Sequence, residues 1–198
     1  VDYVLTIADW FVGQGYPVTA VSPINEPQWA WGGDWVGQEG CHYSADETVE
    51  VLEMFALEMQ KRGCSYKLSG PENGQVTEDY YEYIDKYFAS DILDDFCDTY
   101  SAHSYWTDNN WWAKSSFGEK MAKQYPDKKF EMSEWCELPC QHDIDDITAG
   151  LIMARTIGED IVHTGVNSWS TWVAVNEGGN RADSMIAVYD SYEDYAVS

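Results

Sequence analysis

The sequence predicts an α/β fold with a parallel sheet, because short strand-like runs alternate with amphipathic helices. Apolar residues recur at helical spacing over residues 1–12 and again over residues 49–59. Short apolar runs of β character, such as residues 17–22 and 129–133, lie between the helical segments. Helix-length crossovers between short strands favour parallel pairing. With 198 residues and 44% apolar content, the chain can form one domain over residues 1–198.

The predicted elements follow one another as a helix, four βα units and a last strand. Helices are expected over residues 1–12, 44–63, 78–89 and 115–125, and another helix begins at Asp143. The second helix opens with a capping box, Ser44 to Glu47. Strands are expected over residues 17–22, 66–70, 96–103, 129–133 and 166–173. Since a closed (β/α)8 barrel has eight strands, these elements predict either an open doubly wound sheet or part of a barrel.

Composition excludes several classes of partner. Acidic residues outnumber basic ones 35 to 11, giving a net charge of −24, so the surface repels nucleic acid and anionic membranes. No apolar run is long enough for a transmembrane helix. The chain opens Val1-Asp2-Tyr3, without an initiator Met or a basic signal-peptide segment. We therefore expect a mature or truncated polypeptide, and the opening does not decide whether the protein is secreted.

The sequence gives no reason to expect a metal or another cofactor. The five cysteines form no metal-binding pair, and their odd number leaves at least one without a partner in the chain. His42, His103, Glu26 and Glu134 carry side chains that can bind a metal, but no HExxH motif is present to favour a metal site. The G-x-S-x-G elbow of serine hydrolases is also absent.

Polar and aromatic residues gather at the ends of the predicted strands, where parallel α/β proteins bind ligands. Glycoside cleavage needs one carboxylic acid to protonate the leaving oxygen and one carboxylate to attack or support the anomeric carbon. Flat aromatic rings can pack against sugar rings. The strand-end set fits this chemistry: Asn25, Glu26, Glu72, Asn73, His103, Tyr105, Glu134 and Trp169.

Two of these strand ends resemble known signatures. The segment Ser22-Pro23-Ile24-Asn25-Glu26-Pro27-Gln28-Trp29 resembles the acid/base signature of glycoside hydrolase family 30, and Glu131-Met132-Ser133-Glu134-Trp135 resembles that family's nucleophile strand. Comparable segments occur at residues 38–43, 101–106 and 168–172, so the resemblance covers nearly the whole chain. Asn-Glu-Pro alone is weakly specific, but a second strand-end Glu three βα elements later makes the pattern strong.

The resemblance implies a fold and an extent. The family has a (β/α)8 barrel with the acid/base after strand four and the nucleophile after strand seven. On that template the chain is a partial TIM barrel of about strands 4–8, lacking the first three βα units and the β-sandwich that accompanies the barrel. We expect a secreted or extracellular protein that acts on a polysaccharide or oligosaccharide. The sequence gives no basis for an oligomeric state.

The resemblance also implies roles for individual residues. Glu26 would be the general acid/base and Glu134 the nucleophile of a retaining mechanism, with the carboxyl groups about 5–5.5 Å apart. Asn25 would bind the sugar 2-hydroxyl. Tyr105 or His103 would hold Glu134 ionised, and both are expected among the substrate-binding residues. Three Trp residues would contact sugar: Trp169 or Trp172 beneath the cleaved unit and Trp29 on the leaving-group side. Trp169 and Trp172 cannot both face the barrel interior, because they are three apart on a strand.

Some alternatives stay open at the level of sequence. The motif after the acid/base most resembles the endo-β-1,6-galactanase branch, while glucuronoxylan and β-1,6-glucan remain alternative substrates. A non-catalytic carbohydrate-binding remnant and an inactive fragment are the other hypotheses. Glu72 and Asn73 are more often hydrogen-bonding residues of a barrel rim than ligands of a substrate.

Overall fold

The computed structural model describes residues 1–31, 38, 40–137, 147–177, 184–188 and 195–197. Five strands follow the chain in the predicted order, one of them interrupted: β1 (Ala20–Val21), β2 (Lys67–Leu68) continued by β3 (Pro71–Asn73), β4 (Thr99–His103), β5 (Lys129–Glu134) and β6 (Ser168–Trp169). All pairs among them are parallel. The sheet order is β1-β2 and then β3-β4-β5-β6.

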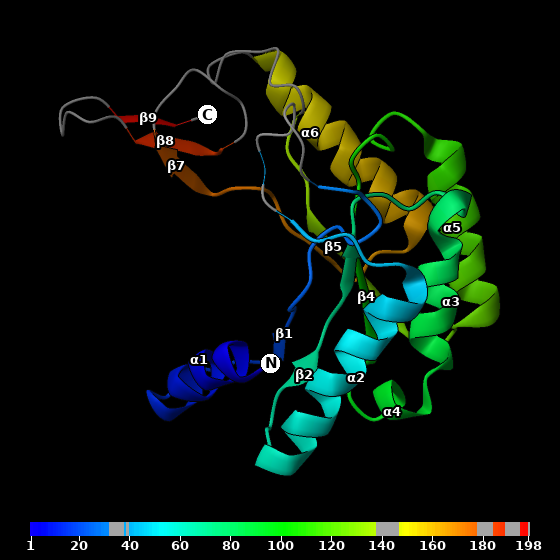
Figure 1. Cartoon of the computed structure of the whole chain (residues 1–198). Helices are drawn as coiled ribbons and strands as arrows, with labels where there is room; N and C mark the ends of the chain where they lie inside the picture. Colours follow the sequence, from blue (N-terminus) through cyan, green and yellow to red (C-terminus); the bar gives the residue numbers. More distant parts are fainter. Residues whose placement is uncertain (32–37, 39, 138–146, 178–183, 189–194, 198) are drawn as a thin grey trace.

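Helices connect these strands in the described residues: α1 (Asp2–Gly13), α2 (Ala45–Arg62), η1 (Glu78–Tyr80) with α3 (Tyr81–Ala89), α4 (Asp91–Asp94), α5 (Trp111–Gln124), and α6 (Ile147–Glu159) with the π-helix η2 (Asp160–Thr164). Helices α2, α3 and α5 lie together on one side of the strands (Figure 1). Strand order never reverses along the described sheet, whereas a doubly wound sheet reverses at its switch point. Of the two predicted folds, the partial (β/α)8 barrel is therefore confirmed, and the open doubly wound sheet is wrong.

Local sequence explains where the helices begin and end. The Ser44 hydroxyl oxygen accepts the Glu47 N–H, and the Glu47 carboxylate accepts the Ser44 N–H, so the predicted capping box begins α2. Gly63 ends this helix with a left-handed φ of 69°. Helix α5 begins at Trp111, four residues earlier than predicted, because the Asn110 side chain caps it by accepting the Ala113 N–H. The predicted helix start, Asp143, lies outside the described residues. Within the described residues, α6 begins at Ile147.

The core lies between the strands and the helices that cover them. It contains the inward residues of α2 and the interior of β2, β4 and β5, including Leu52, Phe55, Leu68, Ala102 and Met132. The segment after β6 forms a separate sheet of β7 (Val175–Glu177), β8 (Ile186–Val188) and β9 (Tyr195–Val197). None of the helices in the described ranges combines the length and apolar character needed to cross a membrane.

Candidate active site

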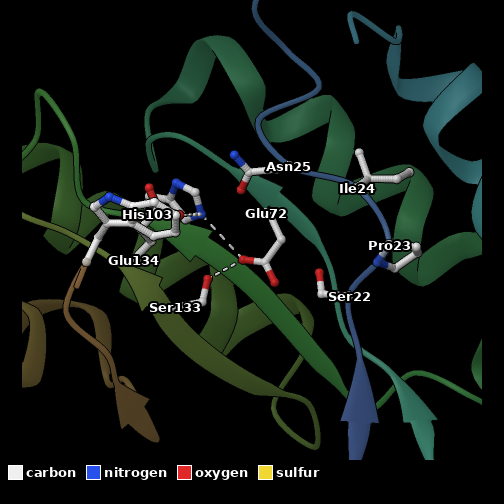
Figure 2. A pocket seen from close by; sticks show the side chains of 9 residues that line it. Ser22, Pro23, Ile24, Asn25, Glu72, His103, Ser133 and Glu134 are labelled. Carbon is white, nitrogen blue, oxygen red and sulfur yellow. Dashed lines mark hydrogen bonds and ion pairs between the residues drawn. The ribbon is translucent and has the colours of Figure 1, made fainter. Parts of the chain in front are cut away.

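The carboxyl ends of the strands surround one cavity, with side chains contributed by β3, β4 and β5 and by the segments after β1 and β6 (Figure 2). Its volume is about 310 Å³. The lining is mixed apolar and acidic: Ser22, Pro23, Ile24, Asn25, Glu72, His103, Ser133, Glu134 and Trp172. The strand-end prediction therefore located the region in which the polar side chains meet.

Glu26 is not among the residues that line this cavity, but it contacts His103, which is. Its backbone adopts a left-handed φ of 48°, which is uncommon for a residue with a Cβ atom. The Glu26 N–H donates to the Glu72 carbonyl at 2.9 Å, and Trp31 Nε1 donates to the Glu26 carbonyl at 3.2 Å. These bonds direct the 3% exposed Glu26 inward, where its Oε1 lies 3.0 Å from His103 Nδ1. Such strained conformations are found preferentially at functional sites.

A bulge in β5 brings two consecutive side chains to the cavity. Ala102 pairs with Met132 but His103 pairs with Glu134, so Ser133 is the extra residue. In a regular strand Ser133 and Glu134 would point to opposite faces. The bulge breaks this alternation, and both residues line the cavity.

Glu134 is held by groups that stabilise its charge. Tyr105 donates its hydroxyl to Glu134 Oε1 at 3.0 Å, and His103 Nε2 lies 3.8 Å from Glu134 Oε2. Burial raises the pKa of Glu134, and the charges of Glu26 and Glu72 add to this effect. His103 and the Tyr105 hydrogen bond act in the opposite direction and lower the pKa of Glu134, although its net shift is upward.

His103 is surrounded by carboxylates. Burial lowers its pKa, but contacts with Glu26 and Glu72 and the charge of Glu134 outweigh burial and raise the pKa of His103 to about 9. Its ring is therefore an imidazolium at neutral pH, in which both nitrogens carry a proton.

The same residues were tested as a metal site. One ligand atom each from Glu26, His103 and Glu134 lies within 4.8 Å of the others. A neutral ring nitrogen is required for a histidine ligand. The contacts of both His103 nitrogens with carboxylates instead favour the protonated ring, so this donor set suits an ion-paired site better than a metal centre.

The structure separates the predicted sugar contacts into two groups. Asn25 and Trp172 line the cavity, with Asn25 solvent-exposed and Trp172 51% exposed. Trp29 packs edge-on against Trp31 and Trp106, outside the cavity lining. Trp169 points away, since its Nε1 donates to Asp160 in the helix layer at 2.9 Å. Trp169 therefore faces the helix layer and not the cavity, in line with the opposite orientations expected for Trp169 and Trp172.

From the sequence, one residue at the cavity, Glu72, was assigned to the barrel rim, and another, Ser133, was not predicted. Glu72 carried a strand-end signal but was interpreted as a rim residue, and it lies 8% exposed against His103. Ser133 was missed because regular strand alternation places it opposite Glu134. Only the bulge, for which the sequence gives no clear signal, changes its direction.

Solved structures similar to this chain share its fold at low identity. A conserved exported protein from Bacteroides fragilis has a TM-score of 0.74 and 21% identity, with 93% of this chain and 42% of that chain covered. The catalytic domain of GH30 xylanase C from Talaromyces cellulolyticus has a TM-score of 0.71 and 12% identity, covering 100% and 42%. An endo-β1,6-glucanase has a TM-score of 0.67 and 16% identity, covering 99% and 45%.

This chain spans less than half the length of each of these three structures. No curated protein matches it in sequence. The family model described as O-Glycosyl hydrolase family 30 matches residues 1–187, which is most of the chain. The chain therefore belongs to glycoside hydrolase family 30.

Proposed function

We propose that the site is the catalytic centre of a retaining glycoside hydrolase, with Glu26 as general acid/base and Glu134 as nucleophile. The observation that carries the proposal is the spacing of the two side chains. An oxygen of Glu26 and an oxygen of Glu134 lie within 4.8 Å of each other. Retaining enzymes hold their carboxyl groups about 5–5.5 Å apart, whereas inverting enzymes need about 6.5–9.5 Å for an intervening water.

The environments of the two carboxyl groups fit a double displacement. In the first step Glu134 attacks the anomeric carbon while Glu26 gives its proton to the leaving oxygen. In the second step Glu26 takes a proton from water, and the water oxygen replaces Glu134 at the anomeric carbon. Tyr105 favours the ionised form of Glu134 that the first step requires. Asn25 lines the cavity next to Glu26 and can bind a sugar hydroxyl, and Trp172 offers an aromatic face.

The proposed substrate is a β-linked polysaccharide cut internally, with β-1,6-galactan as the first choice. The Asn-Glu-Pro segment and the residues after it support the galactan assignment by resemblance. Two similar structures are named as a xylanase and an endo-β1,6-glucanase, so xylan and β-1,6-glucan belong on the same panel. An extracellular location is proposed with this substrate class.

Hydrolysis of purified glycans tests this function. Wild type, Glu134→Gln and the exposed control Glu50→Gln on α2 are incubated with β-1,6-galactan, glucuronoxylan and β-1,6-glucan. We expect wild type and Glu50→Gln to release oligosaccharides that retain the anomeric configuration, and Glu134→Gln to release none. Inverted products would contradict the nucleophile role of Glu134.

A second candidate function is glycan binding without cleavage. The exposed aromatic side chains near the site favour it, since Trp106 is 65% exposed and Trp172 is 51% exposed. Affinity electrophoresis with the same glycans distinguishes the two functions. Retarded migration with no product from wild type would support binding alone, and would count against the hydrolase.

A further inference from the structure

Glu72 is a third buried carboxylate at the site, and the two-carboxylate mechanism does not use it. Its Oε2 lies 3.5 Å from His103 Nε2 (Figure 2), whereas Glu26 contacts the other ring nitrogen, Nδ1. Ser133, which precedes the proposed nucleophile, donates its hydroxyl to the same oxygen. The Glu72 carbonyl also accepts the Glu26 N–H at 2.9 Å. Glu72 therefore connects the segments that carry Glu26, His103 and Glu134.

The backbone directs Glu72 into this position. Pro71 pairs with Ser101 and Asn73 with Ala102, so the register of β3 against β4 shifts across Glu72. Glu72 has a left-handed φ of 61°, as Glu26 has at 48°. Such a conformation costs a residue with a Cβ atom about 1–2 kcal/mol. Two strained glutamates contact opposite nitrogens of one buried histidine, so the surrounding structure stabilises this arrangement.

Three carboxylates from three different parts of the chain face His103. Glu26 comes from the segment after β1, Glu72 from β3, Glu134 from β5, and the ring of Tyr105 lies 5.7 Å away. Removing one carboxylate would leave the cation with weaker support in a site where the His103 side chain is 1% exposed.

We propose that Glu72 is a positioning residue, which holds His103 charged and oriented between the two catalytic glutamates. The proposal rests on the function proposed above. When Glu26 gives its proton to the leaving oxygen, a negative charge forms on it, and the Nδ1–H of His103 stabilises that charge. His103 keeps its own proton throughout, and Glu72 favours this charged state from the Nε2 side. The acid/base cycle then moves protons only between Glu26, the leaving group and water.

NMR titration of the His103 ring tests the proposal in the absence of substrate. The samples are wild type, Glu72→Gln and the matched surface control Glu50→Gln, with the His103 signal assigned by its loss in His103→Gln. We expect a His103 pKa of about 9 in wild type and in Glu50→Gln. Glu72→Gln should lower this pKa by about 1, the effect of losing one close opposite charge. An unchanged pKa in Glu72→Gln would overturn the proposal.

Ser133→Ala supplies a second variant in case Glu72→Gln does not fold. It keeps every charge and removes only the hydroxyl that donates to Glu72. We expect the pKa of His103 to shift by a smaller amount, because the Glu72 oxygen that faces Nε2 has lost the donor that orients it. A folded Ser133→Ala with the wild-type pKa would count against the proposed role.

The pH profile of hydrolysis separates failure of this inference from failure of the proposed function. Glu72→Gln should lose activity about tenfold, with the alkaline limb of kcat moved to lower pH, because His103 then loses its proton at lower pH. A merely structural role would lower the yield of folded protein but leave the limb in place. If wild type cleaves glycan, Glu134→Gln does not, and the Glu72→Gln limb is unmoved, only the role of Glu72 is wrong. If wild type and Glu134→Gln behave alike on the glycan panel, the proposed function fails. The titration still measures the effect of Glu72 on the pKa of His103.

Discussion

Two buried charge clusters meet at the end of β4, and they differ in how their charges are balanced. His103 faces the cavity, where Glu26, Glu72 and Glu134 surround one cation. The next residue, Ser104, points to the helix layer and donates to both oxygens of Asp160 at 2.9 Å. Consecutive residues of an extended segment point to opposite sides, so one strand end serves both clusters.

The cluster in the helix layer, here called the closed cluster, lies outside the cavity lining and pairs a buried acid with a buried cation. Asp160 is fully buried, forms an ion pair with Lys114 Nζ at 2.9 Å and accepts the Trp169 indole N–H. The cavity cluster has more carboxylates than cations, opens to a cavity and contains two left-handed glutamates. A buried acid paired with a buried cation is typical of a structural cluster, whereas unbalanced charge and strain are typical of a site that does chemistry.

The largest expected difference between the clusters is in activity. Glu134→Gln should reduce hydrolysis by about 10³-fold or more, because the proposed nucleophile is lost. The free energy of unfolding should stay within about 0.5 kcal/mol or rise, since one of several crowded carboxylates is neutralised. Thermal unfolding and hydrolysis rates check both statements. A large loss of stability in Glu134→Gln would mean that this cluster, too, is structural.

Asp160→Asn should show the opposite behaviour. It leaves Lys114 as a buried cation without its closest partner, which costs about 3–5 kcal/mol of stability. Denaturant unfolding measures the loss. The pH limits of any hydrolysis by the folded fraction should be unchanged, because Asp160 does not line the cavity. A shift in those limits at full stability would contradict the division into two clusters.

Tyr105→Phe tests the hydrogen bond to the proposed nucleophile. Burial already raises the pKa of Glu134, and loss of the Tyr105 hydroxyl should raise it further. The ionised fraction at a given acidic pH therefore falls, so the acid limb of kcat/KM should move to higher pH. We expect activity at the optimum to fall about tenfold, or about 1.4 kcal/mol. An acid limb that stays in place would show that Tyr105 does not control Glu134.

The last comparison concerns stability alone and the packing around the closed cluster. A Cβ atom at Gly118 of α5 would lie 2.1 Å from the His163 carbonyl of η2, so Gly118→Ala should destabilise the fold by about 1–3 kcal/mol. Gly150 in α6 has no atom within 4 Å of such a Cβ, and Gly150→Ala should stabilise by about 0.5–1 kcal/mol. Equal effects in thermal unfolding would contradict the close packing of α5 on η2.

The sequence predicted the fold well where periodicity and caps act locally. The alternation of strands and helices and the Ser44 capping box are confirmed, because each depends on residues close together in the chain. The predicted start of α5 was four residues too late. Trp111 and Trp112 belong to the helix, because Asn110 is its N-cap. The separate sheet after β6 was not predicted. Its strands β7 and β8 are short, and their preference for a strand depends on the partner strand more than on the local sequence.

The site was predictable in its residue types and less so in its contacts. Strand-end position identified Glu26, His103 and Glu134 as neighbours. The choice between Tyr105 and His103 as the hydrogen-bond donor to Glu134 needed coordinates, and so did the role of Glu72. These contacts depend on two register shifts and two positive φ angles, which arise from tertiary packing rather than from local preference.

Trapping of a glycosyl-enzyme tests the central claim most directly. In Glu26→Gln the general base of the second step is absent, so an aryl glycoside with a good leaving group should form the covalent intermediate faster than water removes it. Intact-mass spectrometry should then detect one added glycosyl unit, and peptide mapping should place it on Glu134. A turnover-competent wild type whose Glu26→Gln variant carries no adduct, or carries it on another residue, would contradict the assignment of Glu134 as nucleophile.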